Sequence, residues 1–288
     1  KVEKNDWKTI EKAKYCFDSD GRMRTGWHYE NGDIYYLGNG SEGYTRSGWY
    51  FLESNGKKRP AEGSISKDLV PDSENGKWYY FQSNGKARKG ENGVPKEAAI
   101  DGRKYYFDEN GVMLTGWQCV KEKAEPGDGT GISRFVYLGG KEDGMLKGQW
   151  LETSERPWDT KAWSTALNVQ AVRKTNAEET ALMKKDGSRW FYLENNGIPL
   201  FLSADATGVK DGAVKIDGKY YFFDSYGVCQ SGLIKFTSGG KMETAYFDPE
   251  AGGAMSIGRN TNAVDKKDKV YTFCSGTSGS EKGCVQML

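Results

Sequence analysis

The chain has 288 residues, of which 38 are glycine and 13% are aromatic, while apolar residues make up only 36%. Its 41 Lys and Arg residues balance 40 Asp and Glu residues to a net charge of +1, which excludes long-range electrostatic attraction of nucleic acid or an anionic membrane. Mean hydropathy is −0.76 and no run of about 18 apolar residues occurs, so no membrane insertion is expected.

Short aromatic runs recur along the chain, and each predicts a β-strand. Residues 15–27 read YCFDSDGRMRTGW and residues 105–117 read YYFDENGVMLTGW, identical at eight of thirteen positions. A third copy at 221–233, YFFDSYGVCQSGL, ends in Leu233 where the others end in Trp. Looser copies start with the runs at 34–37, 49–52, 78–81, 135–138, 190–193, 245–248 and 270–273.

Turn signals surround these runs and predict hairpins. Asn-Gly follows several of the strands, and we expect this dipeptide to form a type I′ turn there. These four pairs are Asn55-Gly56, Asn84-Gly85, Asn110-Gly111 and Asn196-Gly197. A second turn signal precedes the strands, at Asn31-Gly32, Asn75-Gly76, Asp101-Gly102, Asp186-Gly187 and Asp217-Gly218.

A lone two-stranded hairpin is marginal in water, so neighbouring hairpins must bury their aromatic faces against each other. The sequence therefore predicts an all-β, elongated solenoid of stacked β-hairpin repeats with a short irregular or helical insert. Residues 1–150 form the N-terminal repeats and residues 188–288 the degenerate C-terminal repeats. The insert, residues 151–187, is too short for an independent core, and Ala177–Lys185 could form one or two helical turns.

The pattern resembles the choline-binding or cell-wall-binding repeats of Gram-positive surface proteins, roughly G-x-WYYF-x-x-x-G-x-M-x-T-GW, to which glucan-binding and clostridial-toxin repeats are related. In choline-binding members the resemblance implies a cage between consecutive hairpins. The Trp of GW and alternate aromatics of the strand form its walls. The ligand varies among relatives, so choline, glucan, teichoic acid and host glycan stay open.

Matching the motif residue by residue gives candidate walls. Trp27 and Trp117 match the GW Trp, Trp49 matches it but also opens a strand, and Trp150 stands one residue out of place in GQW. Each of these aromatics could instead pack hairpin on hairpin. The first strand aromatic is kept at Trp78, Phe135, Trp190 and Tyr220 and replaced at Ile34, Lys104, Thr244 and Val270. We expect the ligand-binding residues to be Trp27, Tyr36, Trp49, Trp117, Phe135 and Tyr137, with Trp27 and Trp117 foremost.

Catalytic signatures fail on context. Residues 38–43 fit GxGxxG but open no helix, so a dinucleotide site is rejected. His28 is the single histidine, which excludes a histidine-based triad or a multi-histidine metal site, and Asp18-Ser-Asp20-Gly21 lacks the Glu of a calcium loop. A carboxylate pair of the glycosidase kind has no architecture to set its separation. We expect a non-enzyme without cofactor or metal.

Five cysteines, Cys16, Cys119, Cys229, Cys274 and Cys284, are too scattered for a zinc knuckle. Cys274 and Cys284, ten residues apart, are the expected disulfide pair if the protein is exported.

The expected function is non-catalytic binding of a cell-wall or carbohydrate polymer, which could carry choline, through aromatic grooves between repeats. We expect a secreted or cell-surface protein attached non-covalently to the wall, although a chain that opens at Lys1 also fits a cytosolic protein. The alternative is a structural spacer or adhesin scaffold whose partner is a protein.

Overall fold

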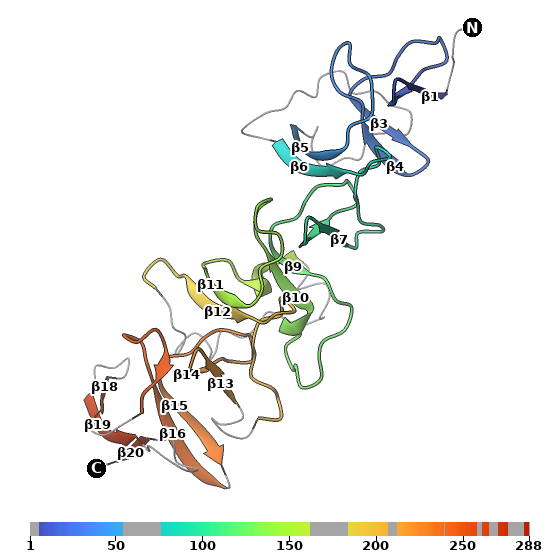
Figure 1. Cartoon of the computed structure of the whole chain (residues 1–288). Helices are drawn as coiled ribbons and strands as arrows, with labels where there is room; N and C mark the ends of the chain where they lie inside the picture. Colours follow the sequence, from blue (N-terminus) through green and yellow to red (C-terminus); the bar gives the residue numbers. More distant parts are fainter. Residues whose placement is uncertain are drawn as a thin grey trace. The chain divides into compact units, whose positions relative to one another are not determined.

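The computed structural model describes residues 6–53, 76–161, 184–206, 212–238, 240–257, 261–264, 270–275 and 285–287. Within these ranges the chain is nearly all-β, as predicted, and Figure 1 shows the strands as short antiparallel pairs. Two single-turn 3₁₀ segments, η1 (Ile132–Arg134) and η2 (Pro157–Asp159), interrupt the strands. No helix in the described part is long and apolar enough to cross a membrane.

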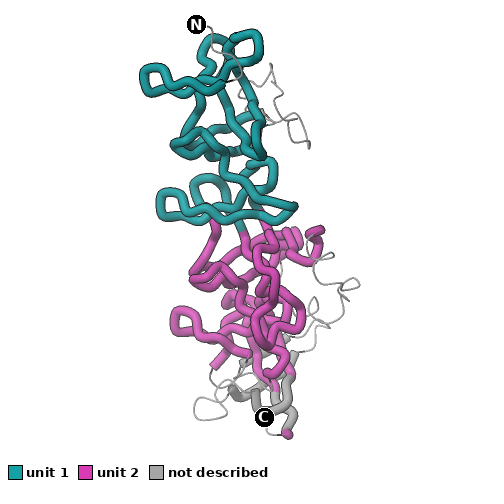
Figure 2. Tube along the Cα trace, turned by 90° about the vertical axis from the view of Figure 1, so that its right-hand side faces the viewer, with its two compact units in different colours: residues 1–115, 138–144 teal, residues 116–137, 145–288 magenta. Residues whose placement is uncertain are grey.

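The chain divides into two compact units, coloured separately in Figure 2. Unit 1 comprises residues 1–115 and 138–144, and unit 2 comprises residues 116–137 and 145–288. The strands of unit 1 are β1 (Trp7–Ile10), β2 (Ala13–Cys16), β3 (Trp27–Glu30), β4 (Asp33–Tyr36), β5 (Gly48–Glu53), β6 (Gly76–Phe81), β7 (Lys96–Ile100) and β8 (Arg103–Phe107). They pair consecutively into four hairpins.

Unit 2 starts with the hairpin of β9 and β10 and ends in two three-stranded sheets, β15-β16-β17 and β18-β19-β20. The predicted two-stranded pattern therefore gains a third strand at these two places. The strands are β9 (Gly116–Cys119), β10 (Phe135–Leu138), β11 (Gln149–Thr153), β12 (Arg189–Leu193), β13 (Ala213–Ile216), β14 (Lys219–Phe222), β15 (Gly232–Ser238), β16 (Lys241–Asp248), β17 (Ala254–Met255), β18 (Thr261–Val264), β19 (Val270–Ser275) and β20 (Val285–Met287).

In the β3–β4, β7–β8 and β13–β14 hairpins, the closing turn directly precedes the aromatic strand. Asn31-Gly32, Asp101-Gly102 and Asp217-Gly218 have positive φ at both residues, as a type I′ turn requires. The expectation for the pairs after the strands was wrong, because among the described pairs only Gly85, Gly111 and Gly197 have positive φ, not the Asn before each. At Asn110-Gly111 the chain makes an Asp-stabilised turn, in which Asp108 Oδ1 accepts hydrogen bonds from the N–H groups of Asn110 and Val112.

Within unit 1 the hairpins stack, one face of each on the opposite face of the next. Trp27, Ile34 and Tyr36 of the β3–β4 hairpin share a core with Tyr79 and Phe81 of β6. The far face of the β5–β6 hairpin packs against the β7–β8 hairpin in the same way. Because strand side chains alternate between faces, each aromatic run serves two neighbours at once.

Unit 2 repeats this arrangement. Trp117 and Phe135 pack on Phe191, and Trp150 and Tyr221 lie in the next core along. The stacked-hairpin architecture predicted from the sequence is thus present in both units. The elongated shape that stacking predicts for the whole chain stays a prediction.

Backbone hydrogen bonds fix one hairpin on the next. The N–H of Met113 donates to the carbonyl of Trp78 at 2.8 Å, and the N–H of Cys229 donates to the carbonyl of Trp190 at the same distance. In both cases the donor lies two residues after a turn glycine, and the acceptor is the first residue of the aromatic run in the hairpin before it. These bonds set the register in which an aromatic from one hairpin meets those of its neighbour.

Some predictions lie outside the described residues. Asn55-Gly56, most of the expected helical turn at Ala177–Lys185, and Cys284 are among them, so the Cys274–Cys284 disulfide stays a prediction. The division of the chain at residues 150 and 188 also stays a prediction. Among the described side chains, Cys16, Cys119 and Cys229 carry free thiols.

Candidate ligand-binding cages

Three aromatic side chains converge between the last two hairpins of unit 1. Trp49 of β5 lies opposite Tyr80 of β6, and Trp78 lies two residues before Tyr80 on the same face. The rings of Trp49 and Trp78 are nearly perpendicular, at 86°, with centroids 6.3 Å apart. Tyr105 of β8, in the next hairpin, is 4.8 Å from Trp49. We call Trp49, Trp78 and Tyr105 the unit 1 cage.

The same arrangement occurs in unit 2. Trp150 of β11 lies opposite Tyr192 of β12, and its ring is 6.3 Å from Trp190 at 79°. Tyr221, from the next hairpin, is 4.8 Å from Trp150. We call Trp150, Trp190 and Tyr221 the unit 2 cage.

Each cage rests on a buried phenylalanine. Phe107, which is fully buried, lies 6.0 Å from Trp49, and Phe223, 1% exposed, lies 5.8 Å from Trp150. The four tryptophans above them are only partly buried. A partly open group of aromatic faces attracts cations through the ring quadrupoles.

Lysine ammonium groups lie over these rings. Lys141 Nζ is 6.0 Å from the centroid of Trp49 and 5.2 Å from that of Trp78, and Lys184 Nζ is 5.5 Å from that of Trp190. At the first hairpin of unit 1, Lys14 Nζ lies 4.4 Å over Trp7, which itself packs 4.9 Å from Tyr35. The aromatic faces are thus placed to hold ammonium groups.

The two tryptophans favoured by the sequence are buried. Trp27 and Trp117 are each 4% exposed. Trp27 packs at 4.7 Å on Tyr79, and Trp117 packs at 5.0 Å on Phe191. Ile34 in the hairpin of Trp27 and Phe135 in the hairpin of Trp117 stand where the unit 1 cage has Trp78, and both are buried as well. These two positions form closed cores in this structure, and their ligand role stays a prediction.

The remaining candidates divide between the same cores and the unit 1 cage. Tyr36 is buried, and its hydroxyl donates to Asn39 Oδ1 at 2.7 Å. Tyr137 is partly buried and lies 5.3 Å from Trp117. Of the six predicted ligand-binding residues, Trp49 is the one that belongs to either cage.

Sequence reasoning missed five cage residues: Trp78, Tyr105, Trp150, Trp190 and Tyr221. Trp150 was set aside because it follows Gln instead of Gly, yet Gln149 pairs with Leu193 as Gly48 pairs with Phe81. A search for a tryptophan at both the GW position and the first position of the aromatic run would have found both cages.

Two other hairpins have no aromatic residue at the position of Trp49. Glu97 occupies it in the β7–β8 hairpin, where its carboxylate accepts a hydrogen bond from Tyr106 Oη at 2.7 Å and contacts Lys104 Nζ at 3.0 Å. Leu233 occupies it in β15, opposite Tyr246. Among the described hairpins, complete sets of two tryptophans and a tyrosine occur in the two cages.

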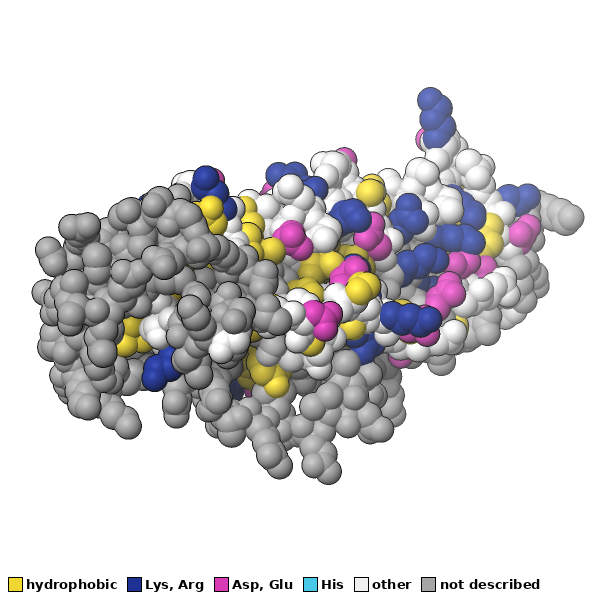
Figure 3. All heavy atoms as spheres, turned by 90° about the horizontal axis from the view of Figure 1, so that it is seen from below, with side chains coloured by type: hydrophobic (Ala, Val, Ile, Leu, Met, Phe, Trp, Pro, Cys, Tyr) yellow, Lys and Arg dark blue, Asp and Glu magenta, His cyan; other side chains and the backbone are white. Residues whose placement is uncertain are grey.

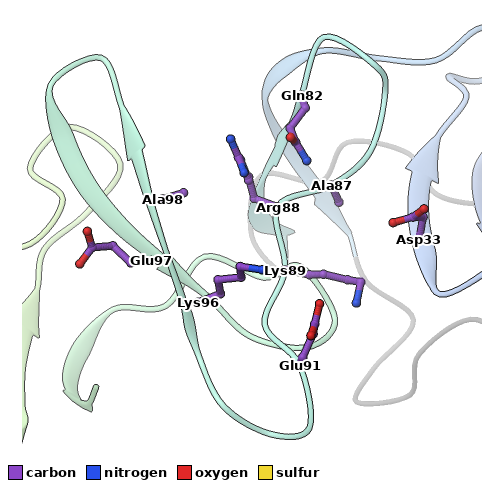
Figure 4. Close-up of a pocket in the computed structure, with 9 residues that line it drawn as sticks. All are labelled: Asp33, Gln82, Ala87, Arg88, Lys89, Glu91, Lys96, Glu97 and Ala98. Atoms are coloured by element: carbon purple, nitrogen blue, oxygen red, sulfur yellow. The ribbon is translucent and has the colours of Figure 1, made fainter. Parts of the chain in front are cut away.

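A separate hollow of about 130 Å³ in unit 1 has a different character. Figure 4 shows charged side chains of both signs around it, among them Asp33, Glu91, Lys89 and Lys96. No aromatic side chain lines it, and its charges are of both signs. Mixed charge also marks the face in Figure 3, where basic and acidic side chains alternate with small apolar areas. This hollow offers no platform for stacking a sugar or an ammonium group.

Cys16 and His28 are buried next to each other in unit 1. Burial raises the pKa of the Cys16 thiol to about 11, and burial lowers the pKa of His28, whose Nε2 is 3.8 Å from Cys16 Sγ. A thiol with a raised pKa is a poor nucleophile. Among the described residues no cluster of three or more His, Cys, Asp or Glu could hold a metal ion.

The fold defines a repeat protein in which stacked β-hairpins bring aromatic side chains of neighbouring hairpins together. A model of the choline-binding repeat matches residues 4–49, and a model of the putative cell wall binding repeat matches residues 73–87, 99–113 and 184–198. The chain therefore carries repeats similar to the choline-binding and cell-wall-binding repeats, as the sequence motif predicted, at positions in both units.

Relatives of known type include two streptococcal enzymes. Glucosyltransferase-S of Streptococcus mutans is 27% identical over 178 residues, and glucosyltransferase-I of Streptococcus downei is 27% identical over 248 residues. These alignments cover 61% and 79% of this chain but only 9% and 14% of the enzymes.

Solved structures with similar chains come from Streptococcus pneumoniae. Choline binding protein F is 20% identical with a TM-score of 0.49, covering 97% of this chain and 85% of that protein. CbpJ is 18% identical with a TM-score of 0.46, covering 98% of this chain and 87% of that protein.

Proposed function

We propose that this chain is a non-catalytic attachment module that binds a cell-wall or carbohydrate polymer bearing quaternary ammonium groups such as choline. The observation that carries the proposal is the repeated cage. Two sets of two tryptophans and one tyrosine, about 100 residues apart in the chain, have ring distances that agree within about 0.2 Å.

The chemistry of the walls favours a cation. Each ring contributes roughly 0.5 to 2 kcal/mol of cation–π energy, so three walls hold a single ammonium at about millimolar affinity once binding costs are met. An ammonium group already lies over rings of each cage. A quaternary ammonium, which donates no hydrogen bond, fits an apolar cage better than it fits the mixed-charge hollow.

Weak sites suit a repetitive polymer. Each free cage adds one weak contact, and where more than one contact engages the same polymer, effective concentration raises the overall avidity by orders of magnitude. This mode of attachment also fits a protein located outside the cell and held on the wall without a covalent bond. We extend the proposal to that location.

The direct test is titration of the protein with choline chloride, monitored by NMR of protein labelled with 5-fluorotryptophan. The nine tryptophans give separate reporters, and Trp190→Phe and Trp78→Phe assign the two that matter. We expect the Trp190 resonance to shift in a saturable way at millimolar choline. If no tryptophan resonance responds, while a protein partner is captured, the repeats serve as a scaffold and the proposed function fails.

A further inference from the structure

The turn after β10 differs from most others in the array. Five residues, 139–143, separate Leu138 from the turn glycine Gly144, whereas three residues, 108–110, separate Phe107 from Gly111. The additional length places Lys141 at the tip of the turn. Although it follows β10, this segment belongs to unit 1.

The turn is fixed internally. The N–H of Gly139 donates to the carbonyl of Gly144 at 2.8 Å, and the N–H of Asp143 donates to that of Gly140 at 3.0 Å. Gly144 has φ of +64°, and a Cβ there would meet the Lys104 carbonyl oxygen at 2.7 Å. The turn therefore packs against β8 with no room for a side chain at Gly144.

A hydrogen bond ties the tip to the cage. Tyr105, the third wall of the unit 1 cage, donates its hydroxyl to the backbone carbonyl of Lys141 at 2.6 Å. The Lys141 side chain, 25% exposed, then extends across the tryptophans, with Nζ within cation–π range of both. Glu142 Oε1 lies 2.5 Å from the same ammonium.

We propose that Lys141 is an internal occupant of the unit 1 cage, which holds its ammonium over Trp49 and Trp78 and so excludes an external quaternary ammonium from that cage. The inference rests on the proposed function and deepens it, because it assigns the two cages different states. Lys141 acts as a specificity-determining residue that leaves the unit 2 cage as the open binding site.

Tethering explains why a primary ammonium can exclude choline. A side chain on a fixed turn is present at its cage at an effective concentration of millimolar or higher, which matches the affinity expected for one free choline. The apparent dissociation constant for choline rises by the inverse of the fraction of time for which the cage is free.

Lys184 lies differently in the unit 2 cage. Its ammonium is within range of Trp190, and it pairs with Glu152 Oε1 at 2.5 Å. Its side chain is 54% exposed, about twice the exposure of Lys141. An arriving cation can displace it toward solvent while its carboxylate partner remains in contact, so we expect this cage to open.

The test compares choline titrations of the full chain in which Lys141 is changed. In Lys141→Ala the cage loses its occupant, and the choline concentration for half-maximal shift of the Trp78 resonance should fall by about fivefold or more. Lys141→Arg keeps a cation on the turn and should respond like the wild type. Lys147→Ala removes the same charge from an exposed position over none of the described rings and is the matched control.

The outcomes separate the two proposals. If Trp190 responds to choline in all proteins but Trp78 responds no better in Lys141→Ala than in the wild type, the inference about Lys141 is wrong and the proposed function stands. An equal gain in Lys147→Ala also overturns the inference, because it reports net charge. If neither resonance responds in any variant, the proposed function fails and the inference falls with it.

Discussion

The two cages have nearly the same walls and different occupants. In each cage the tryptophan at the GW position, Trp49 or Trp150, has its ring centroid 4.8 Å from that of a tyrosine in the next hairpin. Its ring is about perpendicular to that of the second tryptophan. In unit 1 a fixed turn brings Lys141 over both indoles, whereas in unit 2 the more exposed Lys184 lies over Trp190. Cage shape thus follows from hairpin register, while access is decided by a lysine outside the motif.

A second contrast separates the cages from the buried tryptophans. Trp27 and Trp117 keep the GW motif, but Ile34 and Phe135 stand where the cages have Trp78 and Trp190. At these two positions the stacked hairpins bury the GW tryptophan, and a packed core results. An open cage therefore coincides with an indole at both positions.

The largest expected effect is a loss of stability when the buried phenylalanine beneath either cage is removed. Phe107→Ala and Phe223→Ala should each lower the free energy of unfolding by about 3 to 5 kcal/mol, because each removes a fully packed ring and leaves a cavity. Urea denaturation measures this loss. Val94, 64% exposed, is the control, and Val94→Ala should change stability by less than about 0.5 kcal/mol. Costs near 1 kcal/mol for both rings would contradict the stacked-core account.

A smaller effect distinguishes the walls. Trp190→Ala should weaken choline binding by about tenfold, the equivalent of 1.4 kcal/mol from one lost cation–π wall. Trp78→Ala should leave binding by the wild-type chain nearly unchanged, because Lys141 holds that cage. Isothermal titration calorimetry with choline compares the two variants. Equal losses would show that both cages are open.

The pH dependence of stability should differ between equivalent turn aspartates. Burial raises the pKa of Asp224 in unit 2 to about 7, whereas the backbone N–H of Arg22 and other donors lower the pKa of the partly exposed Asp18 in unit 1. Between about pH 4 and pH 7 the folded state holds the Asp224 proton that the unfolded state has released. Its contribution to stability is therefore full below pH 4 and is lost as the pH rises through 7.

Thermal unfolding at pH 5 and pH 8 tests this assignment. Relative to Asp224→Asn, the wild type should lose at least about 2 to 4 °C of Tm between these values, the shift expected for 1 kcal/mol. The Asn side chain keeps an oxygen for the N–H groups of Tyr226 and Val228 and does not titrate. Identical pH profiles for the two proteins would contradict a raised pKa.

The smallest effect concerns the ion pair at the unit 2 cage. Glu152→Gln removes the partner of Lys184, and since both side chains are partly exposed, stability should change by less than about 1 kcal/mol. Without its carboxylate, Lys184 should compete more strongly for Trp190 and raise the choline midpoint about twofold to threefold. A lower midpoint in Glu152→Gln would mean that Glu152 does not restrain the lysine.

Much of the fold could be predicted from the sequence, because strand alternation and turn dipeptides are local signals. The all-β class and the stacking of hairpins follow from them. The sequence did not reveal which turn closes a hairpin, since Asn84-Gly85 and Asn31-Gly32 are the same dipeptide. They fold differently because the side chain of an Asp or Gln just after the strand forms hydrogen bonds with the backbone of the turn. Trp150 was missed because its position in the hairpin is set by the pairing of β11 with β12, not by a glycine directly before it.

The occupant of the unit 1 cage was beyond any local pattern. Lys141 lies 92 residues after Trp49, and only the three-dimensional turn brings it there. The same holds for Tyr105 and Tyr221, whose place in a cage depends on the hairpin before them. Motif matching identifies walls within one repeat, whereas a cage is shared by two repeats.

The central claim is that quaternary ammonium groups bind where the aromatic walls are complete and no internal lysine is fixed. Crystals of the full chain soaked with tetramethylarsonium, a quaternary cation whose arsenic scatters anomalously, test it directly. We expect an anomalous peak among Trp150, Trp190 and Tyr221 in the wild type, and a second peak between Trp49 and Trp78 in Lys141→Ala alone. A wild-type peak between Trp49 and Trp78, or no peak at the unit 2 cage, would contradict it.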